Sequence, residues 1–303
     1  MKGKFISNEE KLKYFERLIV PYKFKDKTRF FIEQYLKGAG KELSSSFWNA
    51  KSSSRMAFDL FSWIVNLQSV KDFSFEYKLP GLQSGGESPN MDVFIETVDE
   101  IIFIESKYSE KANLNYKNGH LPKAYFSREP HGTRGWSLEG RYYNEPICNE
   151  IIAFIEDVDS FLKNNKTRGK CEWFYPKQET CHLIGIILML LGHGDKQIRE
   201  EILKGKELRF YNVFWKFDED EEESELAKTF ESRASKLFNQ IFGSSARPEY
   251  NKTKFIYKTL TVQDLLSNKK QISKHIEYTD EITKLMMPYF ENAKGNTRKS
   301  MQQ

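Results

Sequence analysis

The stretch MDVFIETVDEIIFIESK, residues 91 to 107, decides the fold because it holds two short apolar runs on either side of a polar break. Runs of this length, rich in β-branched and aromatic residues, are typical of β-strands. The first run begins at Met91 and the second at Glu100, so very little chain connects them. Strands joined so closely must lie next to each other and antiparallel. The segment therefore predicts a β-hairpin.

Charged side chains stand at the same end of both predicted strands. Residues alternate between the two faces of a strand, so Phe103, Glu105 and Lys107 share one face of the second strand. A turn centred on the Val-Asp dipeptide would set Phe94 opposite Phe103. The same register would set Asp92 opposite Glu105. We therefore expect two carboxylates side by side, with Lys107 projecting from the same face.

This pair of carboxylates is unfavourable without a positive partner. At a separation of ~5 Å and an effective dielectric of about 20, their repulsion is roughly 3 kcal/mol. A divalent cation held by Asp92, Glu105, a main-chain carbonyl and waters would remove it, and such oxygen ligands favour Mg²⁺ or Mn²⁺ over zinc. Lys107 could then orient an attacking water and stabilise charge on a phosphate. The alternative is structural. Asp92 and Glu105 would lie at frayed strand ends, and Lys107 would neutralise one of them in a surface ion pair, which contributes little stability.

The rest of the chain predicts a mixed α/β fold around one central sheet. Apolar periodicity, serine caps, and proline starts or glycine stops indicate helices at 27–37, 52–68, 147–163, 176–192 and 218–242. Short apolar runs indicate further strands from Phe73, at 208–217, and within 252–266, where the strand runs into a short helix. The core therefore has the expected order αβββαβ, with helices flanking the sheet.

The pattern divides into a core and additions, all within one expected domain over residues 1–303. A helical extension, residues 1–50, includes a short helix that breaks at Pro21. The core spans 52–217, and helix and strand additions follow at 218–303. A polar insertion at 109–146, after the third strand, is long enough to be functional or to be ordered by a partner.

The composition favours a polyanionic partner. The chain of 303 residues carries 47 basic and 43 acidic residues, and seven of the acids stand together at 218–225. The remainder is therefore basic, which suits binding to nucleic acid. The acidic run itself is interpreted as a solvated helix start, where acids complement the helix dipole.

Cysteine, histidine and hydropathy patterns exclude several classes. Three cysteines without CxxC spacing predict reduced thiols, and five histidines without HExxH spacing predict no histidine metal site. The first residues mix charges throughout, unlike a secretory signal. The longest apolar run, 183–191, is far shorter than the ~20 residues that cross a bilayer. We expect a cytoplasmic protein with no membrane segment.

The motif PNMD, followed thirteen residues after its aspartate by the glutamate of ESK, resembles the signature of the PD-(D/E)XK nuclease superfamily. The stretches SSSRMAFDLF and IESKYSE also look like a bacterial group of restriction endonucleases, and the resemblance covers roughly residues 38 to 220. It implies a restriction-endonuclease-like fold and phosphodiester cleavage. By this resemblance Asp92 and Glu105 would be metal ligands and Lys107 the catalytic lysine.

The resemblance points to two further positions. Members often add a glutamate from the first core helix; here the candidates are Glu42, just before that helix, and Asp59, within it, and we prefer Glu42. Some branches carry a glutamine on the helix after the Glu-x-Lys strand, followed four residues later by tyrosine. This sequence offers Gln178, a contact to phosphate or to a metal-bound water, but has His182 in the tyrosine position. That histidine is interpreted as a half-buried structural residue.

The leading hypothesis is a Mg²⁺-dependent deoxyribonuclease, a type II-like restriction endonuclease that cuts double-stranded DNA, with Mn²⁺ as a possible substitute. The insertion offers bases and aromatics that could grip phosphates and stack on bases, or could form an ordinary lid; they are Arg128, Arg134, Trp136, Arg141, Tyr142 and Tyr143. Two alternatives are a repair or mobile-element nuclease acting on single-stranded or branched DNA, and a non-catalytic nucleic-acid-binding protein. A homodimer would let two copies cut both strands.

Overall fold

The computed structural model describes seven segments of the chain together with Glu9, Lys13, Leu43 and Phe47. The segments are 27–37, 52–81, 88–108, 148–164, 176–216, 225–243 and 247–287. The helix expected before Pro21, the start of the helix expected from 218, and the whole insertion 109–146 lie outside them.

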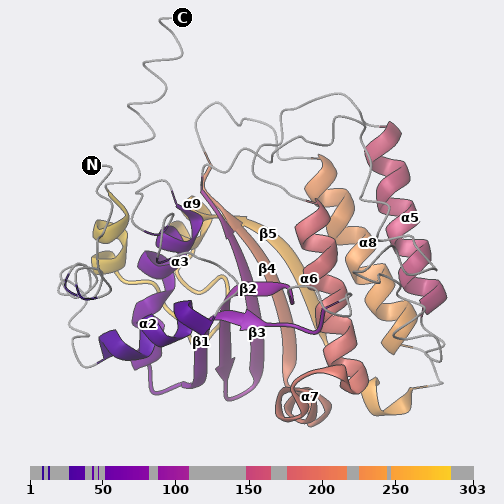
Figure 1. Ribbon diagram of the computed structural model, residues 1–303, viewed down its shortest axis with the longest axis horizontal. Coiled ribbons are helices and arrows are strands. Elements are labelled where there is room, and N and C mark those ends of the chain that lie inside the picture. The colour runs from indigo at the N-terminus through magenta and orange to yellow at the C-terminus, as the bar shows by residue number, and fades with distance from the viewer. Residues whose placement is uncertain are drawn as a thin grey trace, which may run out of the picture.

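A five-stranded mixed sheet forms the centre of the molecule (Figure 1). Its strands lie in chain order: β1 (Val70–Lys78), β2 (Asn90–Thr97), β3 (Glu100–Lys107), β4 (Glu207–Phe214) and β5 (Phe255–Thr261). β1, β2 and β3 form an antiparallel meander, whereas β4 and β5 add parallel to β3. The hairpin and the α/β class expected from the sequence are both confirmed.

Helices cover both faces of the sheet (Figure 1). On one side lie α5 (Cys148–Asn164), α6 (Pro176–Leu188) and α8 (Glu225–Phe242). On the other lie α2 (Thr28–Lys37), α3 (Ser53–Phe61) and α9 (Val262–Ser267), together with a helical stretch at 280–287. Placing helices on both faces buries the two sides of the apolar strands.

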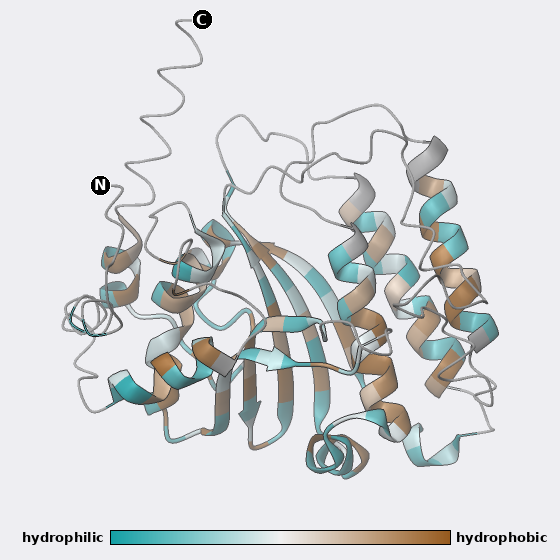
Figure 2. Cartoon of the chain, in the orientation of Figure 1, coloured by the Kyte–Doolittle hydropathy of each residue, from teal (hydrophilic) through white to brown (hydrophobic). Residues whose placement is uncertain are grey.

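Each face of the sheet has its own apolar core, set by strand alternation. On β3, Ile101 and Phe103 join the core beneath α5, α6 and α8, while Ile102 and Ile104 join the core beneath α3. All eight residues of β3 are buried. The hydropathy colouring shows the resulting brown interior on both sides of the strands (Figure 2). A fully buried β3 means that its charged residues are inside the protein as well.

Several predicted boundaries differ from those observed. The helix expected over 52–68 is α-helical only to Phe61 and continues as a 3₁₀ turn, Ser62–Asn66, in which Trp63 Nε1 donates to the Leu60 carbonyl at 2.8 Å. α6 ends at Leu188 and is followed by a π turn, Met189–His193. Within this turn Gly192 leaves the helical conformation, with a φ of 95°. Only glycine adopts that φ readily, so the turn ends where the sequence placed a stop.

A short helix after α6 was not expected. α7 (Lys196–Leu203) begins with Asp195, whose side chain accepts from the main-chain N–H groups of Gln197 and Ile198. Only Ile198 and Ile202 of its eight residues are buried, which gives the helix too narrow an apolar stripe to stand out in the sequence. None of the helices in the described parts of the chain combines the length and apolar character needed to cross a bilayer.

α6 reaches the sheet closely because it has a glycine at the point of contact. A Cβ built on Gly185 would lie 2.9 Å from Leu79 Cβ and 3.2 Å from the Pro80 carbonyl oxygen. Any larger residue would push α6 away from the end of β1. The position of α6 matters because this helix carries three of the side chains described below.

α2 offers a direct test of how the core beneath α3 is packed. Phe31 is fully buried, with ring centroids 5.3 Å from Phe58 and 5.8 Å from Phe75, whereas its neighbour Phe30 is 38% exposed. We expect Phe31→Ala to lower the free energy of unfolding by about 3–5 kcal/mol, the usual cost of deleting a buried phenyl ring. Denaturant unfolding measures the change.

Phe30→Ala is the matched control, because it removes the same group from the next position of the same helix. Its loss should be less than half that of Phe31→Ala. Equal losses would show that α2 does not pack on the sheet through Phe31.

Candidate active site

The hairpin register agrees with the one expected from its turn. Phe94 is the partner of Phe103, and the last regular pair is Val93 with Ile104. Asp92 and Glu105 are the next residue on each strand. Here the Asp92 carboxylate turns to β3 and its Oδ2 accepts a hydrogen bond from the Ser106 main-chain N–H at 2.7 Å. The two carboxylates therefore stand at the same end of the hairpin.

Glu105 is the centre of the polar contacts at this end. Its side chain is fully buried, and its Oε1 accepts from Lys107 Nζ and from Gln178 Nε2, each at 2.6 Å. Its Oε2 lies 3.5 Å from His182 Nδ1 and receives no hydrogen bond from any described residue. A buried carboxylate oxygen without a donor is costly, so this atom calls for a partner that the described side chains do not supply.

α6 brings Gln178 and His182 to the same face, one helical turn apart. The sequence pattern predicted this pairing, and the structure places both beside Glu105. Burial lowers the pKa of His182, partly offset by the Glu105 charge and by a hydrogen bond to the main chain of Asn90. The imidazole is therefore neutral at physiological pH and does not neutralise Glu105.

The charge of Asp92 is poorly compensated. Burial and the nearby Glu105 charge raise its pKa well above the usual range, against the opposing effects of Lys107 and the Ser106 hydrogen bond. Lys107 Nζ lies 2.6 Å from Glu105 Oε1, and its charge also acts on Asp92. Among the described residues one ammonium group thus serves two carboxylates, which is the excess of negative charge that the sequence predicted.

Glu179, next to Gln178 on α6, is a third acidic residue near Glu105 that the sequence analysis missed. It is fully buried, and its Oε2 accepts from the Tyr257 hydroxyl at 2.9 Å. Burial, with the charge of Glu105, raises its pKa to about 8. Its only signal in the sequence is adjacency to Gln178, because Tyr257 comes from a strand far along the chain.

Glu76 on β1 was also missed. It is the one non-glycine residue with positive φ, 54°, in the described part of the chain. The pairs on either side of it, Phe75 with Val93 and Tyr77 with Met91, put it across from Asp92, and Asn90 Nδ2 donates to its carboxylate at 3.3 Å. A left-handed backbone at a non-glycine residue is strained, and such strain concentrates at functional sites.

The remaining predicted site residues are not brought into this group. Glu42, and the arginines and aromatics of the insertion, lie outside the described residues. Asp59 is buried on α3, where both of its carboxylate oxygens accept from Arg55 Nε at 3.0 and 3.1 Å. An ion pair within one helix accounts for the burial of this charge.

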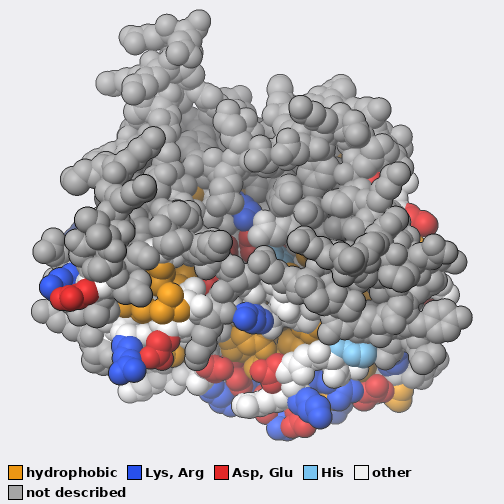
Figure 3. Space-filling view, viewed as in Figure 1, with side chains coloured by type: hydrophobic (Ala, Val, Ile, Leu, Met, Phe, Trp, Pro, Cys, Tyr) orange, Lys and Arg blue, Asp and Glu red, His pale blue; other side chains and the backbone are white. Residues whose placement is uncertain are grey.

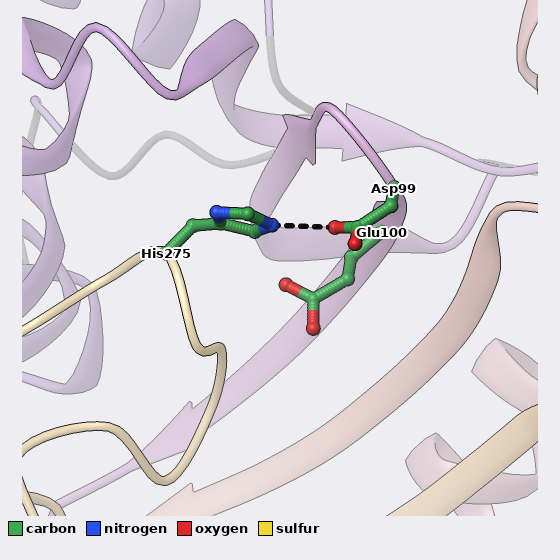
Figure 4. A group of neighbouring side chains, drawn as sticks. All are labelled: Asp99, Glu100 and His275. Carbon is green, nitrogen blue, oxygen red and sulfur yellow. Dashed lines mark hydrogen bonds and ion pairs between the residues drawn. The ribbon is translucent and has the colours of Figure 1, made fainter.

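A second acidic group lies at the opposite end of the hairpin (Figure 4). Ligand atoms of Asp99, Glu100 and His275 lie within 4.8 Å of one another and could hold a metal ion. The His275 ring points at Asp99, with 2.6 Å between Nε2 and Oδ1. Lys274 pairs with Asp99, and Arg209 pairs with Glu100 at 2.8 Å. The protein's own cations thus neutralise both carboxylates, unlike those of Asp92 and Glu105.

Comparison of this chain with models of known protein families, with curated proteins and with solved structures gave no match. The site is therefore interpreted from its own geometry.

The pKa of Asp92 gives a prediction about stability without metal. A carboxyl with a higher pKa in the folded than in the unfolded state holds more protons when folded, so stability falls as pH rises above the ordinary value of 3.8. We expect Asp92→Asn to stabilise the metal-free protein increasingly as pH rises from 4 to 7, because the amide oxygen still accepts from Ser106. Urea unfolding at a series of pH values measures this.

Asp99→Asn is the control of opposite sign. Hydrogen bonds from Lys274 and His275 lower the pKa of Asp99 despite the opposing effect of partial burial, so its charge stabilises the fold above pH 3.8. This variant should lose stability over the range in which Asp92→Asn gains it. A loss of stability in both variants would mean that Asp92 is well compensated.

Proposed function

We propose that this protein is a metal-dependent DNA endonuclease that hydrolyses phosphodiester bonds. The observation that carries the proposal is the convergence of Asp92, Glu105, Lys107 and Gln178 at one end of the β2–β3 hairpin, with a buried Glu105 oxygen that receives no hydrogen bond from the described residues. The space-filling view has basic, acidic and histidine side chains close together near the middle of one face (Figure 3).

The donor set fits Mg²⁺, with Mn²⁺ as a substitute. Asp92 and Glu105 would hold the ion through carboxylate oxygens, the ligand type that hard cations prefer. When bound, Mg²⁺ would lower the pKa of a coordinated water and polarise the phosphate. Asp92 itself would then be held ionised, because an adjacent cation favours the charged form of a carboxyl.

The protein's own groups have separable tasks in this proposal. Gln178 fixes Glu105 by donating to Oε1, which leaves Oε2 for the ion. Lys107, also bonded to Oε1, carries the positive charge that would orient the attacking water and stabilise the charge developing on the phosphate. Lys107 and Glu105 share a face of β3, so both can reach one bound phosphate.

The architecture supports the same proposal. A helix, an antiparallel three-stranded meander, further helices and a parallel fourth strand follow one another as α3, β1, β2, β3, α5, α6, α7 and β4. Apart from the additional helices before β4, this is the αβββαβ order expected of a restriction-endonuclease-like core. The basic balance of the chain suits double-stranded DNA. A type II-like restriction enzyme is the form we favour over a repair or mobile-element nuclease. A non-catalytic DNA-binding protein would have no reason to keep an uncompensated carboxylate pair buried.

Plasmid cleavage tests the activity. With Mg²⁺, the parent protein should convert supercoiled plasmid to nicked or linear products, and EDTA should stop the reaction. Lys107→Ala should reduce the rate by about 100-fold or more, since it removes the group that stabilises charge in the transition state. The rate is measured by gel densitometry at several enzyme concentrations.

Lys204→Ala is the matched control because Lys204 is an exposed lysine that pairs with Glu201 on α7. It should cleave at the parental rate. Binding to plasmid without any cleavage by the parent, in Mg²⁺ and in Mn²⁺, would favour the non-catalytic alternative.

Metal binding distinguishes the two ends of the hairpin. In calorimetric titrations with Mn²⁺, Asp92→Asn should weaken binding at least about tenfold, as expected when a ligand or its immediate support is lost. His275→Ala should leave the affinity unchanged, because Asp99 and Glu100 are already neutralised. The reverse result would place the ion at the Asp99 end and contradict the proposed site.

A further inference from the structure

Asn212, on β4, lies directly beside Glu105. The two residues are partners in the parallel β3–β4 ladder, so they sit at the same level of the sheet. On β4 the alternate residues Phe210 and Phe214 belong to the core beneath α6, which places Asn212 between them on the face that Glu105 shares. Asn212 therefore stands behind the candidate site, inside the protein.

The amide of Asn212 has no hydrogen-bond partner among the described residues. Its side chain is fully buried, and neither Oδ1 nor Nδ2 makes a hydrogen bond there. Exchanging the two atoms by rotating the amide would not help, since neither position has a partner. The amide must therefore be satisfied by something other than these residues.

Other buried atoms in this region share that property. Glu105 Oε2, Glu179 Oε1 and His182 Nδ1 have no hydrogen-bond partner among the described residues, although all three side chains are buried, and Nδ1 lies 3.5 Å from Oε2. The Glu105 charge acts on Glu179, which shows that the two carboxyls are near each other. Asn212 and Glu179 thus each lie near Glu105, and the three form a polar group centred on Glu105 within an otherwise apolar core.

A metal ion alone does not satisfy this group. An ion could bind the oxygens, but it would leave the Asn212 Nδ2 donor without an acceptor. A water molecule can accept from the amide and donate to Glu105 Oε2, and it can donate to Glu179 Oε1 or accept from it when that carboxyl is protonated. Buried water typically makes about three hydrogen bonds to otherwise unsatisfied polar groups, and this region offers at least that many.

We propose that Asn212, Glu105 Oε2 and Glu179 Oε1 bind internal water, and that Asn212 is a positioning residue for Glu105. Lys107 and Gln178 bond Oε1. Oε2 has two lone pairs, so it can accept from the water with one and keep the other for the ion. Glu105 is thereby fixed in one orientation. The water site stands on the geometry alone, whereas the effect on metal binding rests on the proposed function.

Replacing the amide by an apolar group of similar size tests the water site in metal-free protein. Asn212→Leu would exclude the water and leave both carboxyl oxygens without a donor, so the folding equilibrium constant should fall about tenfold or more. Asn212→Ala leaves room for a second water in place of the amide and should lose less. If Asn212→Leu instead stabilises the protein, the site is dry and the proposal is wrong.

A crystal structure of the parent protein gives an independent observation of the same site. Density for a water within hydrogen-bond distance of Asn212 and Glu105 supports the proposal, and a direct bond between these side chains with no water overturns it. This observation decides the question even if Asn212→Leu does not fold.

Calorimetry with Mn²⁺ tests the positioning role. Asn212→Leu should weaken binding about tenfold, the effect of losing support for a ligand, and Asn212→Ala should stay within about threefold of the parent. Unchanged affinity in Asn212→Leu would refute positioning. If the parent binds no Mn²⁺, the proposed function and the positioning role fail together, while the stability and crystallographic results still decide the water site.

Discussion

The burial of two carboxylates at one end of the β2–β3 hairpin is the constraint on which the neighbouring contacts depend. Glu105 is fully buried in a strand whose every residue is inside the protein, and Asp92 lies at the adjacent position of the neighbouring strand. One lysine cannot neutralise both. The Ser106 N–H and the Gln178 amide each add a hydrogen bond, but neither supplies a charge. The fold keeps a local excess of negative charge that an external cation would relieve.

The two ends of the hairpin show how differently the same residue types can be used. At the turn, Asp99 and Glu100 meet Lys274 and Arg209, which come from segments far along the chain. The Lys274 contact joins the C-terminal part of the protein to the hairpin turn and the Arg209 contact joins β4 to β3, so their role is structural. At the opposite end, Lys107 is the one lysine or arginine that the described ion pairs bring to these acids, and His182 beside Glu105 is neutral. The presence or absence of internal cations, rather than the count of acids, separates a structural group from a candidate site.

The sequence could predict those parts of the site that depend on local spacing. The short Val-Asp turn determines the register of Phe94 and Phe103, and helical periodicity pairs Gln178 with His182. It could not reveal Asn212 or Tyr257, because these approach the site through parallel pairings made after long crossovers. The unexpected α7 had too few apolar residues to produce a helical pattern. Element order was thus predictable, whereas contacts between distant strands were not.

Parallel addition of β4 to β3 also has a consequence for the order of folding. The meander of β1, β2 and β3 closes through short connections, but Glu100 pairs with Glu207 only after the chain between them has been made. Contacts between such distant residues form slowly, since the intervening chain must first lose entropy. During synthesis the β2–β3 hairpin that carries Asp92 and Glu105 should therefore form well before β4 adds beside β3. The free-energy cost of burying the carboxylates of Asp92 and Glu105 therefore arises only at the last stage of folding.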